Sequence, residues 1–219
     1  MLSFNRIMLK KFIFLIGFIL LTGCVSNSIS SAVGDDSFIF STKAQITDKT
    51  QDTTNNVSID IFLKKNTAFR LEVTALLGYQ VGSLLMTRSS LQYAVHPQKI
   101  FVHGPMAGRT LKPLFKQEIE PQILWSLIND DDLNLRGFKC IKPQASMQIC
   151  KSSQADLEIE QRGDLDNHGI SKEGLKKITL ENKNLKMIWI FKSKQLLSSS
   201  QNETFVLNRP KEYKLIAIK

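Results

Sequence analysis

Cysteine and histidine have the widest chemical scope of all side chains, because they act as nucleophiles, bases and metal ligands. The 219-residue sequence contains three of each, namely Cys24, Cys140, Cys150, His96, His103 and His168. No two histidines have metal-ligand spacing on one helix, and His96 and His103 fall in or beside a predicted hairpin. No glycine-rich phosphate loop or nucleophile elbow is present, and no nucleophile can be paired with a base. We therefore expect no metal, no cofactor and no enzyme activity.

One acidic segment begins like a calcium loop. Residues 164–169 place acids at the first and third positions and glycine at the sixth. The twelfth position is Leu175 rather than the bidentate glutamate that calcium requires. We interpret this segment as a solvated turn, and the acidic run Asp130–Asp132 as a solvated loop that ends a helix.

Cys24 follows an N-terminal secretion signal. Three cations, Arg6, Lys10 and Lys11, precede the apolar run Phe12–Leu21, which is about half of the ~20 residues that a spanning helix needs. Leu21–Cys24 (Leu-Thr-Gly-Cys) resembles the bacterial lipoprotein box, in which the cysteine is acylated. The alternative is an ordinary cleavable signal with an incidental cysteine. Acylation would anchor the chain firmly in the membrane, facing the periplasm.

Three segments follow from this interpretation. Residues 1–23 are the lipoprotein signal peptide, residues 24–36 an acylated flexible tether rich in Ser, Asn and Gly, and residues 37–219 one domain. Val25, rather than Asp, after the cysteine favours the outer membrane. Loss of the signal lowers the formal charge from +9 to +6, an excess that suits anionic head groups or an acidic protein. A nucleic-acid partner is not expected, because the lysines are spread along the chain.

Cys140 and Cys150 remain after acylation of Cys24. An even pair of cysteines in an oxidising compartment predicts a disulfide, here one that joins two neighbouring strands.

Apolar residues recur at every second position over much of the chain, which predicts strands with one buried face. The alternating sets are Val57, Ile59 and Ile61; Phe69, Leu71 and Val73; Leu157 and Ile159; and Ile178 and Leu180. Residues 185–191 and 213–218 are apolar on both faces, so we expect something to cover their outer side. Turns at residues 65–66, 77–78, 97–98 and 182–184 predict a meander of antiparallel hairpins in one continuous sheet.

Only residues 110–129 look helical. Thr110 is a candidate cap for a short helix bearing Leu111, Leu114 and Phe115, and Pro121 suits the first position of a second helix. That second helix carries an apolar stripe formed by Ile123, Leu124, Leu127 and Ile128. Two helices inserted in a meander should lie across one face of the sheet as a lid.

The hairpin tip at residues 74–79 is unusually apolar. Leu76 and Leu77 precede Gly78, although hairpin tips normally favour polar residues. Either at least one leucine is left without cover, or the tip folds under and both leucines enter the core.

Phe69–Gly78, followed by a strand through Met86, resembles the most recognisable segment of the LolB family of outer-membrane lipoprotein receptors. In that family a strand runs into an Asn-Pro-Leu-Gly-type turn; here Ala75-Leu76 replaces the Asn-Pro pair, and Cys140 and Cys150 are additional. The resemblance implies a mainly β fold with a short helical lid, an incompletely closed antiparallel β-barrel of the LolA/LolB type.

The resemblance also implies a function. Such a protein takes acyl chains of lipoproteins from a LolA-like periplasmic carrier into an apolar cavity and inserts them into the outer membrane, aided by a loop, here Leu76, Leu77 and Gly78. The candidate cavity-lining residues are Phe69, Leu71, Val73, Leu84, Met86, Leu114, Leu124, Leu127 and Trp189. Each can equally be plain core. The alternative function is a tethered binding or assembly module with the same fold and no transfer activity.

Overall fold

The computed structural model describes residues 37–115, 120–153, 155–163, 175–197 and 202–219. All of them belong to one compact unit, Asp35–Lys219. The signal peptide, Cys24, the tether and most of the calcium-loop-like segment lie outside the described residues.

In the described residues, twelve strands form one sheet. The first six are β1 (Ser37–Asp48), β2 (Thr53–Lys64), β3 (Ala68–Ala75), β4 (Gln80–Thr87), β5 (Ser90–Val95) and β6 (Ile100–Pro105). The other six are β7 (Lys139–Gln144), β8 (Met147–Lys151), β9 (Asp156–Gln161), β10 (Lys176–Glu181), β11 (Leu185–Leu196) and β12 (Lys214–Ala217). Between β6 and β7 come the helices α2 (Gly108–Phe115) and α3 (Pro121–Asn129) and the 3-10 turn η3 (Leu133–Arg136).

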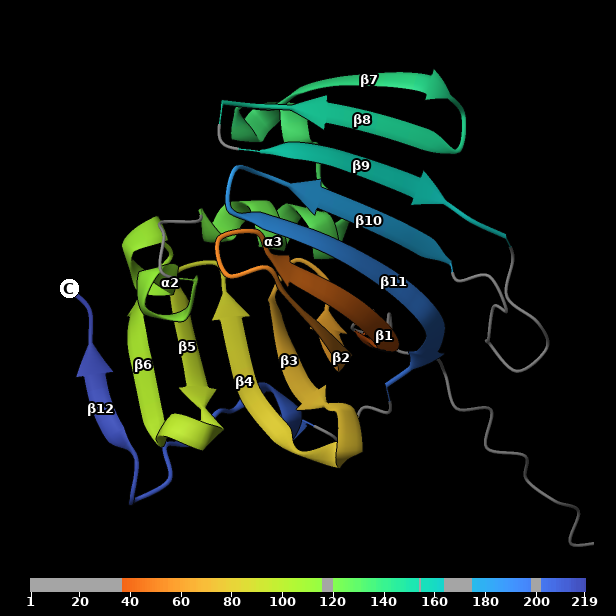
Figure 1. The fold of residues 1–219 in the computed structure, drawn as a ribbon. Helices are drawn as coiled ribbons and strands as arrows, with labels where there is room; N and C mark the ends of the chain where they lie inside the picture. The colour runs from red at the N-terminus through yellow and green to blue at the C-terminus, as the bar shows by residue number, and fades with distance from the viewer. Residues whose placement is uncertain (1–36, 116–119, 154, 164–174, 198–201) are drawn as a thin grey trace, which may run out of the picture. The chain divides into compact units, whose positions relative to one another are not determined.

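The strand order is β12-β6-β5-β4-β3-β2-β1-β11-β10-β9-β8-β7. Two meanders, β1–β6 and β7–β11, are joined where β11 pairs antiparallel with β1. The sheet bends around α2 and α3 (Figure 1), and its two end strands, β12 and β7, are not neighbours in that order. The fold is therefore mainly β with a short helical lid, an incompletely closed barrel, as predicted.

The alternating patterns place one apolar row of side chains against the helices. Ile61, Leu71, Leu84 and Tyr93 are successive register partners across β2 to β5, and all four are buried. They belong to a single core cluster that also contains Leu111 of α2 and five residues of α3 and η3. The rings of Phe69 and Trp125 are 5.7 Å apart, which joins the sheet directly to α3.

One detail of the helices differs from expectation. Thr110 does not cap α2, because the helix begins at Gly108 and the Thr110 hydroxyl donates to the carbonyl oxygen of Pro105. Pro121 does start α3, which ends at Asn129 as predicted. The acidic run after it begins with Asp130, whose side chain is exposed, as expected of a solvated loop, and also pairs with Lys176 of β10 at 2.7 Å.

The last strand also differs. β12 pairs with β6 in parallel rather than antiparallel orientation. A chain that returns to a sheet edge after a long excursion is free to pair in either direction, whereas a tight hairpin enforces antiparallel pairing. Cover on both faces was expected here, but Leu215 is about half exposed, whereas Ile216 packs against the core.

Cys140 and Cys150 form the predicted disulfide, with an S–S distance of 2.06 Å. The two residues are direct partners in the register of β7 and β8, and their Cα atoms are 4.0 Å apart. The disulfide therefore links the edge strand β7 covalently to its neighbour β8.

Candidate functional site

The residues predicted to line a cavity are brought together on the concave face of the sheet. Six of them are buried in the core cluster: Phe69, Leu71, Leu84, Met86, Leu127 and Trp189. Val73 and Leu124 are half-buried and pack against that cluster. Leu114 lies in α2, but its side chain is outside the described set. These side chains contact one another as a packed core, so their role as cavity lining stays a prediction.

The helical lid is tied to the sheet at the C-terminal end of α3. The ammonium of Lys176, on β10, donates to the carbonyl oxygen of Leu127 at 3.0 Å and to the carboxylate of Asp130 at 2.7 Å. On the other side, the Asn129 side chain accepts from the backbone N–H of Asn66 at 2.8 Å. The last carbonyls of a helix lack intrahelical partners, so the Leu127 bond satisfies one of them. These contacts hold the lid closed over the core.

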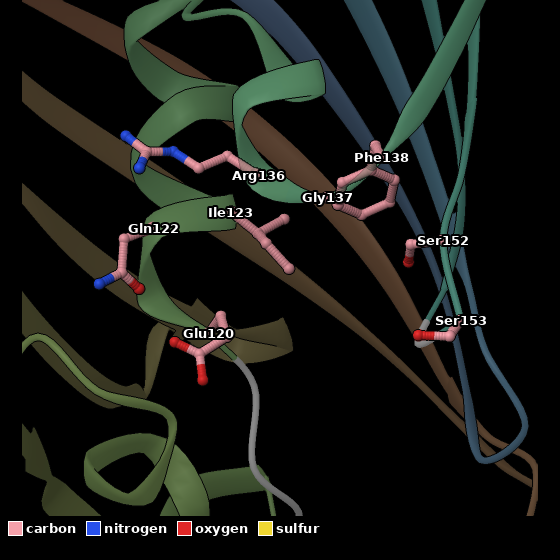
Figure 2. A pocket seen from close by; sticks show the side chains of 8 residues that line it. All are labelled: Glu120, Gln122, Ile123, Arg136, Gly137, Phe138, Ser152 and Ser153. Atoms are coloured by element: carbon pink, nitrogen blue, oxygen red, sulfur yellow. The ribbon is translucent and has the colours of Figure 1, made fainter.

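An opening of about 350 Å³ lies between α3 and η3 on one side and the end of β8 on the other. Figure 2 shows the Ile123 and Phe138 side chains facing this space, with Ser152 and Ser153 on the opposite wall. Ile123 and Phe138 also belong to the core cluster. The opening therefore borders the apolar core, and its polar rim includes Glu120.

The loop between β3 and β4 exposes a leucine in a left-handed backbone conformation. Leu77 is 92% exposed and has φ 77°, ψ 9°, and Gly78 follows with φ 81°. The backbone N–H of Ala75 donates to the carbonyl oxygen of Tyr79 at 2.8 Å and closes the loop. Leu77 thus does not enter the core. Left-handed conformations disfavour bulky residues, so neither burial nor backbone preference explains a leucine here.

A polar network on the convex face was missed by the sequence reasoning. Glu72 of β3 accepts hydrogen bonds from Arg70, Gln80 and Ser83, the last at 2.5 Å. Because a carboxylate only accepts, Ser83 must use its single proton on Glu72 and accept from His96 Nε2, 3.0 Å away.

His96 extends this network to the C-terminal part of the chain. Its Nδ1 lies 2.8 Å from the hydroxyl oxygen of Tyr213. The imidazole therefore bridges Ser83 and Tyr213 through its two ring nitrogens. The alternation of β3 already places Arg70 and Glu72 outward, but no pattern in the sequence indicates which later segment covers them.

Burial changes the ionisation of one core residue. Tyr93 of β5 is almost wholly buried, and its hydroxyl donates to the carbonyl oxygen of Thr110 at 3.1 Å. Burial disfavours the charged phenolate and raises the pKa of Tyr93 to about 12. This residue therefore acts as a neutral anchor between the sheet and α2.

The described part of the chain offers neither a cluster of metal ligands nor a membrane-spanning helix. No group of three or more His, Cys, Asp or Glu side chains there could hold a metal ion. None of the described helices has the length and apolar character needed to cross a membrane.

No protein-family model matches the chain, and no curated protein matches it. Among solved structures, a LolA superfamily protein of Nitrosomonas europaea is similar, with 8% identity, a TM-score of 0.44 and coverage of 79% of this chain and 91% of that one. A DUF1329 family protein of Desulfovibrio piger has 7% identity, a TM-score of 0.44 and coverage of 78% and 90%. At these values the similarities establish neither family nor function, and the fold assignment rests on the strand order itself.

Proposed function

We propose that this protein is a membrane-anchored lipoprotein that takes acyl chains of other lipoproteins into its interior and inserts them into the outer membrane. In this proposal Cys24 is the acylated anchor, and a LolA-like periplasmic carrier supplies the cargo. The protein acts without catalysis or a nucleotide, because the transfer runs downhill when the bilayer holds the chains better than the protein does. An acyl chain gains about 0.8 kcal/mol per buried methylene, so it needs apolar cover throughout.

The observation that carries the proposal is the exposed Leu77. A leucine at 92% exposure and positive φ is unfavourable both in solvation and in backbone conformation. Such strain occurs at sites where it serves a function. A bilayer surface gives this side chain the apolar surroundings that the folded domain does not.

The interior can accept cargo only if the lid moves. The predicted lining residues are buried against one another, so an incoming chain has to displace α3 from the sheet. The opening beside Ile123 and Phe138 is the natural starting point, because it borders both the lid and the core. The contacts of Lys176 and Asn129 set the resistance to that movement.

Two measurements on residues 25–219 test the proposal separately. The first is competition between a fluorescent fatty acid and a synthetic triacylated peptide, which tests uptake into the interior. The second is transfer of the peptide from the protein to vesicles, which tests delivery. Leu77→Asn should keep uptake and lose delivery. A wild-type fragment that takes up neither the fatty acid nor the acylated peptide refutes the proposal.

The second candidate function is a tethered binding or assembly module. The dense packing of Phe69, Met86 and Trp189 favours this alternative, because a permanently closed core leaves no room for an acyl chain. Such a module would show no uptake and would instead bind a fixed partner in the cell envelope.

A further inference from the structure

The C-terminal segment forms a strap across the convex face of the sheet, which we define as residues 202–213. Arg70 of β3 donates to the backbone carbonyl oxygens of Thr204 and Val206 in this strap at 3.2 and 2.9 Å. Near the other end of the strap, the Tyr213 hydroxyl is hydrogen-bonded to Nδ1 of His96. Beyond Tyr213 the chain becomes β12 and joins the sheet beside β6, at the far left of Figure 1.

An open pocket of about 670 Å³ lies between the strap and the sheet. The sheet contributes Arg70, Gln80 and Ser83, the turn after β5 contributes His96, and the strap contributes Glu203 and Asn208. Its size falls within the range of small-molecule sites, about 300–1,000 Å³. The pocket faces away from the apolar interior, because Arg70 and Ser83 alternate with the inward-facing Leu71 and Leu84.

We propose that this pocket binds an uncharged saccharide of the cell envelope. The sheet side of the pocket is rigid, because its polar groups are fixed by bonds to one another: Gln80 Nε2 donates to Glu72 and Ser83, and Ser83 bonds His96. The strap side offers groups that are still available, since the side chains of Glu203 and Asn208 have no hydrogen-bond partner among the described residues. Amides that donate and accept, a carboxylate that accepts and a guanidinium that donates together suit neighbouring sugar hydroxyls, which do both.

The charges of the pocket favour an uncharged ligand over an anion. Arg70 is already paired with Glu72 and with two carbonyl oxygens, so its charge is compensated within the protein. The carboxylate of Glu203 at the rim is exposed and adds negative charge. Arg70, its partner Glu72 and Glu203 together carry a net negative charge, and this charge repels an anionic ligand.

A purely structural role for the network makes a different prediction. If Arg70, Glu72 and His96 only pin the strap, no saccharide binds, and changes at the rim have no measurable effect. Asn208 distinguishes the two roles because it is exposed, lies on the strap and takes no part in the network.

The experiment uses the full-length protein in detergent on an array of neutral and anionic oligosaccharides of two to four rings. We expect binding to a neutral oligosaccharide, and Asn208→Ala should weaken it about fivefold, the equivalent of one hydrogen bond of ~1 kcal/mol. The matched control is Gln92→Ala, an outward-facing residue of β5 that does not line the pocket, and it should bind like the wild type. Binding of anionic sugars alone, no binding, or unchanged affinity of Asn208→Ala overturns the proposal.

Discussion

Replacing Leu77 by asparagine should separate folding from membrane contact. The side chain is 92% exposed, so its removal costs almost no burial in the folded domain. Its backbone has φ 77°, a conformation that costs an ordinary residue about 1–2 kcal/mol but that asparagine tolerates. We therefore expect Leu77→Asn to leave the free energy of unfolding unchanged or to raise it by up to ~1 kcal/mol.

The same substitution should weaken membrane contact strongly. Complete burial of a leucine side chain in an apolar phase contributes about 1.5–3 kcal/mol, and each 1.4 kcal/mol is tenfold in an equilibrium constant. Association of the soluble fragment with vesicles should fall by roughly 10- to 100-fold. Urea unfolding and vesicle co-sedimentation of residues 25–219 measure the two effects independently.

Leu196→Asn is the matched control, because Leu196 is 80% exposed at the end of β11, outside the β3–β4 loop. It removes a similar amount of exposed apolar surface and should leave vesicle association unchanged. Two results would refute the reasoning. A Leu77→Asn variant that unfolds more easily by over 1 kcal/mol would show that the leucine supports the fold. Equal losses of vesicle association in both variants would show that any exposed leucine contributes to membrane binding, whatever its position.

Three further outcomes are expected. The Cys140–Cys150 disulfide spans ten residues. In the chain-entropy treatment, its reduction should lower the free energy of unfolding by about 2.5–3 kcal/mol. Thiol labelling without reductant should modify neither cysteine. The folded-state pKa of Tyr93 is raised from 10.0 to about 12, so its contribution to stability should be complete below pH 10 and be lost as the pH rises towards 12. An ultraviolet titration should show this late ionisation in the wild type and not in Tyr93→Phe. Lys176→Met should speed uptake of a fluorescent fatty acid about fivefold, because loss of the hydrogen bond to Leu127 weakens the attachment of the lid by ~1 kcal/mol. An unchanged rate of uptake would exclude this hydrogen bond as a lid contact.

The strands could be predicted because their periodicity has one dominant cause. Val57, Ile59 and Ile61 alternate with polar residues because one face of β2 meets the core and the other meets solvent. Hairpin turns with local signals were also predictable: Asn66 adopts a left-handed conformation, which short polar residues tolerate. The pairing of β1 with β11 has no such local signal, because it joins residues about 150 positions apart in the sequence.

The helices were harder to predict in detail because tertiary contacts decide their buried faces. The apolar stripe of α3 correctly marked Ile123, Leu127 and Ile128, yet Trp125 and Ser126 are buried as well. That wider burial has two sources: Trp125 packs against Phe69 of β3, and Arg136 of η3 donates to the Ser126 hydroxyl oxygen at 3.1 Å. The strap is held by long-range contacts of Arg70 and His96, and β12 pairs with a strand distant in the sequence; a reading of local patterns captures neither.

Strand β3 links the three regions to which functions are proposed here. Its inward side chains Phe69 and Leu71 are buried in the core, its outward Arg70 holds the strap, and the loop that follows it carries Leu77. Because β3 lies between two long-paired neighbours, it fixes the base of that loop, and the bond from Ala75 to Tyr79 holds Leu77 outward before any membrane is met. A pre-formed loop loses little conformational entropy on insertion. Changes within β3 would disturb all three regions together, so substitutions that separate their roles must lie on exposed positions outside it.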